Sequence, residues 1–439
     1  MSKKKANNQP VTLTAQLAVG VAFAIFMALA KVGFEHTDAG RTVELATYGF
    51  LHRNFLTQTN ENKVVLVDIS NLETEKSDLS DPNGDSKSIE VTSREAIGRL
   101  IDLLFAKGAR AVGVDVDFSP KLNGTWVKQN DPAFFDEMLN RPRQQTVILG
   151  VHRSKSGGAE SWLGHPKYSD LAACIDIPKG VHGDRRYLLS GIKLSSESDT
   201  LPGFGRALGR VFKPDPQPLP KWLSWFVHDR REVVRAEDSE DQLIAEEYLV
   251  DFSGLSALRS QIKTASVDGV SISDDQSING AVVICAELSK GKFEEAFVLS
   301  GIDSLAVPGG LIHACGVTTS VNGRIFELSH EGRIVADILI SVVVLGAFLL
   351  LKDRLEKKNK KPVNHAFLER FILACMCVIV LAMGWLLAVF ARLLWTDYII
   401  VWATLITHRA AHDFTHVLAK FCFAEFSHAA QSATRHETH

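Results

Sequence analysis

The apolar residues of this chain gather in short runs, and two of these runs lead into acidic residues. Residues 64–69 read Val-Val-Leu-Val-Asp-Ile, and residues 111–117 read Ala-Val-Gly-Val-Asp-Val-Asp. Between them, residues 93–107 carry apolar side chains at helical spacing behind Ser93, a residue type that often caps helices. Strand, helix and strand in this order predict two parallel strands that are buried on both faces.

The same pattern continues through the middle of the chain. Residues 73–89 are rich in Ser, Asp and Asn without an apolar period, which predicts an exposed loop. We expect further helices at residues 131–139, 201–211 and 309–321, and further strands at residues 146–151, 248–252 and 281–286. Together these elements predict one α/β domain with a mainly parallel sheet over residues 34–333.

Longer apolar runs flank this domain. Residues 10–30 and 371–391 contain no charged side chain, and runs of this length match the roughly 20 residues that cross a bilayer core. Two weaker runs each contain one acid, Asp337 or Asp397. The pattern predicts four transmembrane α-helices, one N-terminal and three C-terminal, at residues 11–33, 334–351, 366–391 and 393–408. A cleaved signal peptide is the alternative for the first of them.

The charges divide along the same boundaries. Residues 34–333 hold 33 Lys or Arg against 43 Asp or Glu, whereas the rest of the chain holds 15 against 8. Because short basic loops stay in the cytoplasm, we expect residues 1–10, 352–365 and 409–439 to be cytoplasmic and the large domain to be extracytoplasmic. The predicted location is the bacterial inner membrane, with the lipid bilayer as a partner.

The cysteines give little chemistry. Cys174, Cys285 and Cys315 are an odd number within the large domain, so they cannot all pair. Cys285 lies in an apolar run and Cys315 among small residues, which favours buried free thiols. No spacing among the cysteines is typical of a zinc site.

Several stretches together carry a resemblance to a known family. They are residues 64–69, Arg94 with the run 108–116, Phe118-Ser119, and residues 249–254, 279–284 and 308–314. In this order and spacing the chain resembles the type-2 CHASE extracellular sensor domain of bacterial membrane receptors. The resemblance implies an external α/β domain between one span and three further spans, followed by a cytoplasmic enzyme. Residues 409–439 are too few for that enzyme, so we expect it to be missing.

The predicted sheet also places candidate ligand-binding residues. Ligands of open parallel sheets bind beyond the carboxyl ends of the strands, where we expect Asp68, Asp115 and Asp117 on adjacent strands. Arg94 and His313 lie in segments that match the family near this edge. Such carboxylates would suit a divalent cation or a polar solute. The alternative is that they cap helices and accept hydrogen bonds from loop amides.

Two other segments carry weaker signals of binding. Residues 203–209 contain glycines as phosphate-binding loops do, but their spacing and context do not fit such a loop. His408, His412 and His416 recur at every fourth residue, which makes them weak metal candidates or simply a polar helical stripe. The opposite face of that tail is apolar and predicts contact with a partner through Phe414, Val417, Leu418, Phe421 and Phe426.

No catalytic motif stands out in the sequence, so we predict no catalytic residues, no cofactor, no metal and no enzyme activity. The leading hypothesis is an inner-membrane sensor or scaffold whose external domain relays a signal to a separate cytoplasmic effector protein. The alternative is a structural subunit of an oligomeric membrane complex. We expect a homo-oligomer and no nucleic-acid partner.

Overall fold

The computed structural model of the chain describes most of the central part and two long helices near the end. It covers residues 21–22, 25–26, 29–54, 56, 64–80, 86–118, 131–152, 166–178, 186–194, 199–215, 217–235, 242–265, 276–288, 296–299, 302–303, 305–358 and 365–394. The chain divides into two compact units. One contains residues 1–47, 221–227 and 327–439, and the other, the α/β unit, contains residues 48–220 and 228–326.

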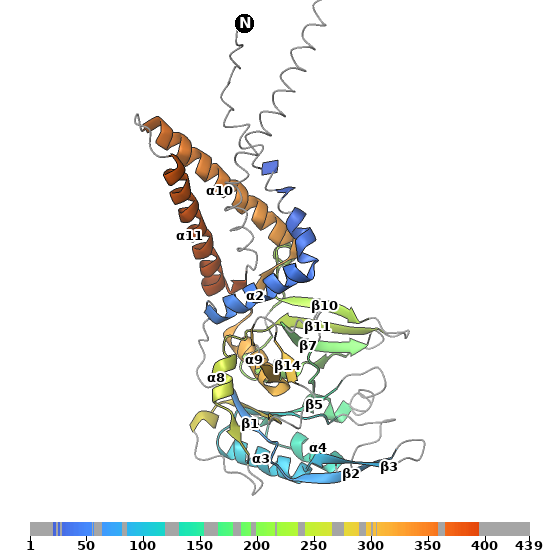
Figure 1. The fold of residues 1–439 in the computed structure, drawn as a ribbon. Helices are drawn as coiled ribbons and strands as arrows, with labels where there is room; N and C mark the ends of the chain where they lie inside the picture. The colour runs from blue at the N-terminus through green and yellow to red at the C-terminus, as the bar shows by residue number, and fades with distance from the viewer. Residues whose placement is uncertain are drawn as a thin grey trace, which may run out of the picture. The chain divides into compact units, whose positions relative to one another are not determined.

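A six-stranded sheet forms the centre of the α/β unit (Figure 1). Its strand order is β12-β1-β13-β4-β5-β6, and every neighbouring pair is parallel. The strands are β1 (Val64–Asp68), β4 (Ala111–Asp115), β5 (Thr146–Val151), β6 (Ala172–Cys174), β12 (Lys263–Thr264) and β13 (Val282–Ala286). The expected strands at residues 64–69, 111–117, 146–151 and 281–286 correspond to four of them.

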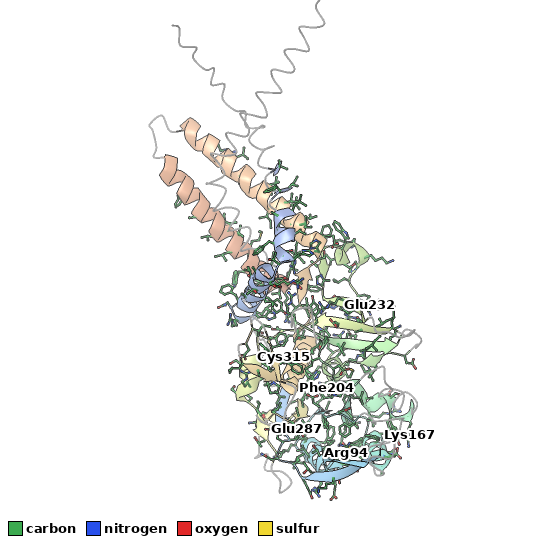
Figure 2. The ribbon with its side chains drawn as sticks, turned by 45° about the vertical axis from the view of Figure 1, so that its right-hand side comes forward. Arg94, Lys167, Phe204, Glu232, Glu287 and Cys315 are labelled. Carbon is green, nitrogen blue, oxygen red and sulfur yellow. The ribbon has the colours of Figure 1, made fainter. Side chains whose placement is uncertain are left out.

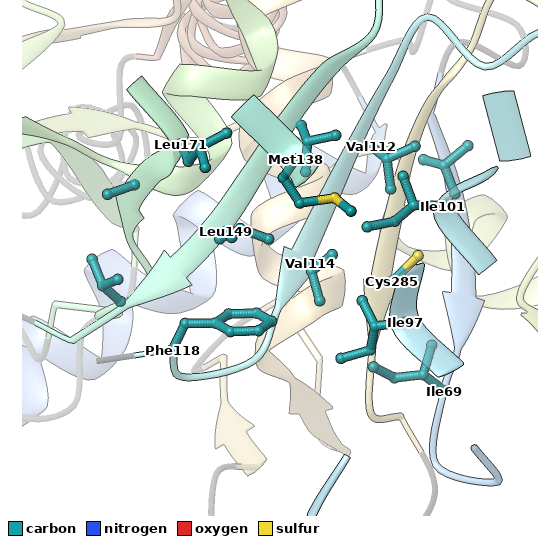
Figure 3. Packing of buried hydrophobic residues seen from close by; sticks show 14 of the residues in the cluster. Ile69, Ile97, Ile101, Val112, Val114, Phe118, Met138, Leu149, Leu171 and Cys285 are labelled. Atoms are coloured by element: carbon teal, nitrogen blue, oxygen red, sulfur yellow. The ribbon is translucent and has the colours of Figure 1, made fainter. Parts of the chain in front are cut away.

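Helices cover both faces of this sheet, which is why all residues of β1 and β13 are buried. On one face lie α3 (Arg94–Ala106) and α4 (Asp131–Leu139). Figure 3 shows Ile97 and Ile101 of α3 packed with Val112 and Val114 of β4. On the other face lie α6 (Phe204–Gly209), α8 (Leu255–Ser260) and α9 (Gly309–Asn322). Each fully buried Val, Leu or Ile contributes roughly 1.5–3 kcal/mol, so the two layers account for much of the stability.

Two sequence expectations for the α/β unit are wrong. Residues 73–89 are not a loop, because β2 (Thr74–Ser80) and β3 (Ser86–Thr92) pair there as an antiparallel hairpin. Residues 248–252 are not a strand of the parallel sheet. Strand β11 (Leu243–Leu249) ends near their start and belongs to an antiparallel sheet of order β10-β11-β7-β8. The alternation of β11, with Leu243 and Ala245 buried, is typical of that kind of strand.

The other strands of that sheet are β7 (Tyr187–Leu194), β8 (Leu201–Pro202) and β10 (Arg230–Arg235). A small hairpin joins β14 (Ala296–Val298) and β15 (Ala306–Pro308). Short 3-10 helices span Pro166–Leu171 and Gln276–Ile278.

Helix α6 packs closely against β4 of the parallel sheet. A Cβ on Gly113 of β4 would lie 2.5 Å from Leu208 Cδ1 and 2.8 Å from Phe204 Cζ, so a larger residue there would have to displace the ends of both side chains. All six residues of α6 are buried, including Arg206. Helix α6 also packs against α9, and Figure 2 labels Phe204 and Cys315 on these two helices.

Helix α2 (Asp38–Asn54) contributes residues to both units by sequence. The unit that contains the chain ends also holds α7 (Lys221–Ser224), α10 (His330–Lys358) and α11 (His365–Ala391). A three-stranded sheet is formed by β9 (Val227–His228), β16 (Phe326–Leu328) and β17 (Leu393–Leu394).

The predicted membrane topology is wrong. Among the residues that the structure describes, no helix has both the length and the apolar character that crossing a bilayer requires. This finding overturns the four transmembrane α-helices at residues 11–33, 334–351, 366–391 and 393–408. It also overturns the multi-pass inner-membrane location with its extracytoplasmic domain and cytoplasmic ends. Most of the first and last of these segments lies outside the described residues.

Buried ion pairs give a physical reason for part of this error. Lys31 and Asp337, at the edges of two predicted spans, are both buried and bonded to each other. Arg333, near the start of α10, pairs with Glu44 at 3.0 Å and also with the buried Glu327. The length of an uncharged run says nothing about these ion pairs. They form only in the folded protein, within the unit that contains the chain ends.

Candidate functional site

The carboxyl edge of the parallel sheet is the site that the sequence predicts, and its strand order changes that prediction. Asp68 ends β1 and Asp115 ends β4, but β13 lies between the two strands, with Ala286 in register with both acids. The expectation of adjacent strands is therefore wrong. Two strand spacings separate the backbones of Asp68 and Asp115 by roughly 10 Å.

Asp68 is engaged in the local structure of this edge. Its side chain is buried, and Oδ1 accepts hydrogen bonds from the Ser70 amide at 3.0 Å, the Ser70 hydroxyl at 2.5 Å and the Leu288 amide at 3.0 Å. These bonds join the loop after β1 to the loop after β13. The arrangement matches the structural alternative, in which the acid accepts from loop amides.

Arg94 and Asp117 do not join a common site with Asp68. Arg94, labelled in Figure 2, begins α3 and is buried. Its guanidinium carbon lies 4.3 Å from the centroid of the Phe118 ring. Its backbone amide donates to Glu75 Oε1 at 3.2 Å. Asp117 is half-buried in the segment after β4. The stacked guanidinium has a packing role on the α3 face.

His313 and Asp115 are the two predicted residues that the structure brings together. His313 lies in the first turns of α9 and is buried; its Nε2 donates to the Ile175 carbonyl at 3.1 Å. The same nitrogen lies 4.0 Å from Asp115 Oδ1, whereas the buried Nδ1 has no hydrogen-bond partner. Helix α9 approaches closely here, because a Cβ on Gly310 would lie 2.5 Å from the Ala286 Cβ.

A second histidine–carboxylate pair lies further along α9. Thr319 of α9 donates its hydroxyl to the Cys315 carbonyl at 2.7 Å and accepts from the Asp251 amide at 2.8 Å. Asp251 Oδ1 lies 3.8 Å from Nδ1 of His52, which belongs to α2. His52 is 1% exposed, and neither ring nitrogen has a hydrogen-bond partner.

Sequence reasoning missed this second pair. Asp251 was visible as an acid at the end of an apolar run, but it was assigned to a strand of the parallel sheet. Nothing in the mixed-polarity segment around His52 distinguishes that residue. The only usable signal was the small-residue character of residues 309–321, which lets α9 pack closely against its neighbours.

The thiols of Cys285 and Cys315 are buried and form no disulfide, as predicted. Cys174 is also buried, and its Sγ donates to Asp176 Oδ2 at 3.2 Å. Burial raises the pKa of the Cys285 thiol to about 12 and also raises the pKa of Cys315, near which the Asp251 charge acts in the same direction. A thiol in this state is protonated at neutral pH and is a poor nucleophile.

The described residues contain no group of three or more His, Cys, Asp or Glu side chains that would hold a metal ion. The weak metal candidates His408, His412 and His416 lie outside the described residues, and so do the proposed partner contacts. These are Phe414, Val417, Leu418, Phe421 and Phe426.

No family model, curated protein or solved structure matches the chain. The resemblance to the type-2 CHASE domain therefore stays a prediction that rests on the quoted residues alone.

Proposed function

We propose that the chain is a non-enzymatic sensor or scaffold, in which the α/β unit receives a signal and α9 transmits it to a separate effector protein. The observation that supports this proposal is the pair of incomplete histidine–carboxylate contacts along α9. His313 and Asp115 lie near the start of the helix, and His52 and Asp251 lie beside Thr319.

Each contact is slightly too long to be a hydrogen bond. The nitrogen–oxygen distances of 4.0 Å and 3.8 Å exceed the usual 2.7–3.2 Å range, although all four side chains are largely buried. Buried ring nitrogens without partners are uncommon in folded proteins. A shift of about 1 Å would close either contact. We propose that α9 alternates between two such arrangements, so that a ligand that prefers one of them biases both ends.

The chemistry of the buried thiols supports the non-enzymatic part of the proposal. Cys285 and Cys315 have raised pKa values through burial, so they do not supply a thiolate. The role assigned to residues 409–439 as the effector contact stays a prediction.

Hydrogen exchange on the full chain tests the relay. In His313→Gln the amide can still donate to the Ile175 carbonyl, while the imidazole beside Asp115 is lost. We expect the exchange rates of backbone amides 48–54, around His52, to change several-fold, because coupling through packed elements is typically about 0.5–2 kcal/mol. His152→Gln is the matched control, since it also removes an imidazole beside a carboxylate, that of Asp176 at 2.5 Å, but His152 follows β5 and is not part of α9.

The relay is wrong if His313→Gln alters exchange only within residues 309–316, or if the control variant produces the same change at residues 48–54. Urea midpoints of both variants separate a specific coupling from a general loss of stability, because a general loss accelerates exchange in every slowly exchanging segment.

A specific surface feature favours the second candidate function, a structural subunit of an oligomer. Val298 of β14 is 57% exposed and Leu305, directly before β15, is 60% exposed, although both are large apolar residues. Self-association through this hairpin would cover them. A mass measurement of the purified chain decides between the candidates: a stable oligomer that Val298→Asp dissociates favours the subunit role, and a monomer removes it.

A further inference from the structure

A cavity of about 210 Å³ lies in the α/β unit beside α6, α9, β10 and β11. It is lined by Arg206, Lys213, Asp229, Arg230, Tyr248, Leu249, Thr319, Ser320, Gly323, Arg324, Ile325 and Phe326. Its volume is below the roughly 300–1,000 Å³ of pockets for drug-sized ligands, so it suits a small solute. None of the five residues predicted at the carboxyl edge lines it.

Positive charge dominates the lining of this arginine-lined cavity. Arg206, Lys213, Arg230 and Arg324 contribute four cationic side chains, and Asp229 contributes the one carboxylate among the lining residues. Asp229 is shared, because its Oδ2 lies 3.0 Å from Arg324 Nε and 3.8 Å from Arg230 Nε. Burial lowers the pKa of Arg324, as do the charges of Arg230 and Arg206, against the opposing effect of Asp229 and Asp215. The guanidinium groups therefore repel one another in a partly desolvated space.

Arg206 is the most deeply buried of these cations. The residue is 5% exposed, and its Nε lies 2.6 Å from Asp215 Oδ1. Asp215 also binds Arg210, whose Nη2 lies 2.7 Å from Oδ2, so one carboxylate serves two guanidinium groups. Arg206 Nη2 is buried and has no hydrogen-bond partner. A buried donor of this kind carries a desolvation cost that a bound acceptor would remove.

Arg206 lies beside the aromatic ring of Tyr248 in the cavity lining. Its guanidinium carbon lies 5.6 Å from the centre of the Tyr248 ring. Burial raises the pKa of the Tyr248 phenol, so its hydroxyl stays protonated at neutral pH. A protonated phenol adds no negative charge to the cavity.

The carboxyl end of α9 offers a structural explanation for the cations, but it is insufficient. A helix end carries about half a negative charge, which favours nearby cations. Here the Gly323 amide already closes onto the Thr319 carbonyl at 3.0 Å, and Arg324 donates to the Gln217 carbonyl. Besides Asp229, Asp215 pairs with Arg206 and Arg210, and Glu246 Oε1 lies 2.8 Å from Arg230 Nη1. These three carboxylates and half a charge from the helix end do not balance Arg210 and the four lining cations, so a net positive charge remains.

We propose that the arginine-lined cavity binds a small tetrahedral oxyanion of the phosphate class, either inorganic phosphate or the phosphate of a small ester. Arg206 is the anchoring residue, and Arg230 and Arg324 complete the positive surround. Guanidinium groups match phosphate oxygens with paired, charge-assisted hydrogen bonds, which makes arginine suited to this role. The site does not depend on the histidine relay, whose exchange experiment can fail while phosphate binding remains.

Calorimetric titration of the full chain tests the site, with inorganic phosphate, glycerol phosphate and acetate as separate ligands. We compare the unmodified chain with Arg206→Lys, Arg324→Gln and Arg210→Gln. Arg206→Lys keeps the charge but loses the fork of donors. Arg210 is the matched control: it lies next to α6 and shares Asp215 with Arg206, but it does not line the cavity. Circular dichroism and thermal melting establish that each variant is folded.

We expect saturable binding of phosphate, weaker binding of acetate, and a loss of about tenfold or more in affinity for Arg206→Lys and Arg324→Gln. Arg210→Gln should leave the affinity within about twofold. Preference for the ester over inorganic phosphate identifies a phosphate-bearing metabolite as the ligand class, and the reverse identifies the free ion. The proposal is overturned if the folded chain shows no saturable phosphate binding, or if the Arg206 and Arg210 variants lose affinity equally.

Discussion

Asp68 at the carboxyl edge of the parallel sheet and Arg206 in the arginine-lined cavity are both buried and charged, but the protein uses the hydrogen-bonding capacity of Asp68 more fully. At the edge, Asp68 accepts three hydrogen bonds from its own loops. In the cavity, Arg206 retains a buried nitrogen without a partner. A charged residue at the expected place of a ligand is therefore weaker evidence for ligand binding than a charged residue with unused hydrogen-bond donors.

The largest effect that tests this comparison is the loss of the Asp68 carboxylate. Asp68→Ala leaves the Ser70 and Leu288 amides without their acceptor, and we expect the free energy of unfolding to fall by about 3 kcal/mol. Asn71→Ala in the same loop is the control, because Asn71 is exposed and such changes stay within about 0.5 kcal/mol. Urea denaturation measures both.

Calcium gives a second readout for the same residue. Because Oδ1 of Asp68 already accepts from two loop amides and the Ser70 hydroxyl, calcium should not raise the melting temperature of the unmodified chain. A calcium-dependent rise that Asp68→Asn abolishes would restore the cation reading of the edge and remove the contrast with the cavity.

An intermediate effect is expected at Gly113, where the sheet admits α6. A Cβ there would lie 2.5 Å from Leu208 Cδ1, so Gly113→Ala must displace that side chain of α6. We expect a loss of about 1–3 kcal/mol in stability, together with weaker phosphate binding if the displacement shifts the helix and Arg206 with it. Gly280→Ala lies in open space and tests stability alone, through the positive φ of that residue. Unchanged phosphate affinity in Gly113→Ala would show that the seating of α6 does not shape the cavity.

The smallest effect concerns Asp215, whose Oδ1 pairs with Arg206 Nε. Burial alone would raise the pKa of Asp215, but the hydrogen bond from Arg210 and the charges of Arg206, Arg210 and Arg230 outweigh it and lower the pKa. A carboxyl group with a lowered pKa in the folded state stabilises the fold above its ordinary pKa of 3.8, and this contribution is lost as the pH falls through the folded value.

Solvent screening keeps that contribution below about 1 kcal/mol, because the Asp215 side chain is 35% exposed. Between pH 5 and pH 3 the unmodified chain should therefore lose slightly more stability than Asp215→Asn, measured as urea midpoints at each pH. Parallel losses in both proteins would mean that Asp215 is not engaged by the arginines.

Much of the α/β unit could be predicted from the sequence, because its strands are short, continuous and apolar. The runs that contain Val64 and Ala111 and the helix behind Ser93 could all be recognised, since burial on both faces leaves a simple pattern. The order of strands could not, because β13 comes late in the sequence yet inserts between β1 and β4. Because of that insertion, Asp68 and Asp115 do not lie on adjacent strands as the sequence predicted.

The apolar runs near the ends led to the wrong topology for a related reason. A count of uncharged residues treats each run in isolation, whereas Lys31 and Asp337 pair across more than three hundred residues of sequence. Sequence spacing carries no information about such partners. The tail that contains His408 and Phe414 lies outside the described residues, and its predicted roles stay predictions.

The arginine-lined cavity shows the opposite failure. The glycines of the segment around Arg206 resemble those of a phosphate-binding loop, but their spacing does not fit one. In the structure these glycines serve packing: a Cβ on Gly209 would meet the Ser320 side chain at 2.4 Å. The anion chemistry lies in side chains from α6, β10 and the segment after α9, which come together only in the fold.

The most direct test of this account is a crystal structure of the full chain grown with inorganic phosphate. The account predicts an ordered tetrahedral anion within hydrogen-bond distance of Arg206 Nη2, with Asp68 still bonded to Ser70 and Leu288. A cavity without an anion, or a phosphate bound at the carboxyl edge beside His313, would contradict it.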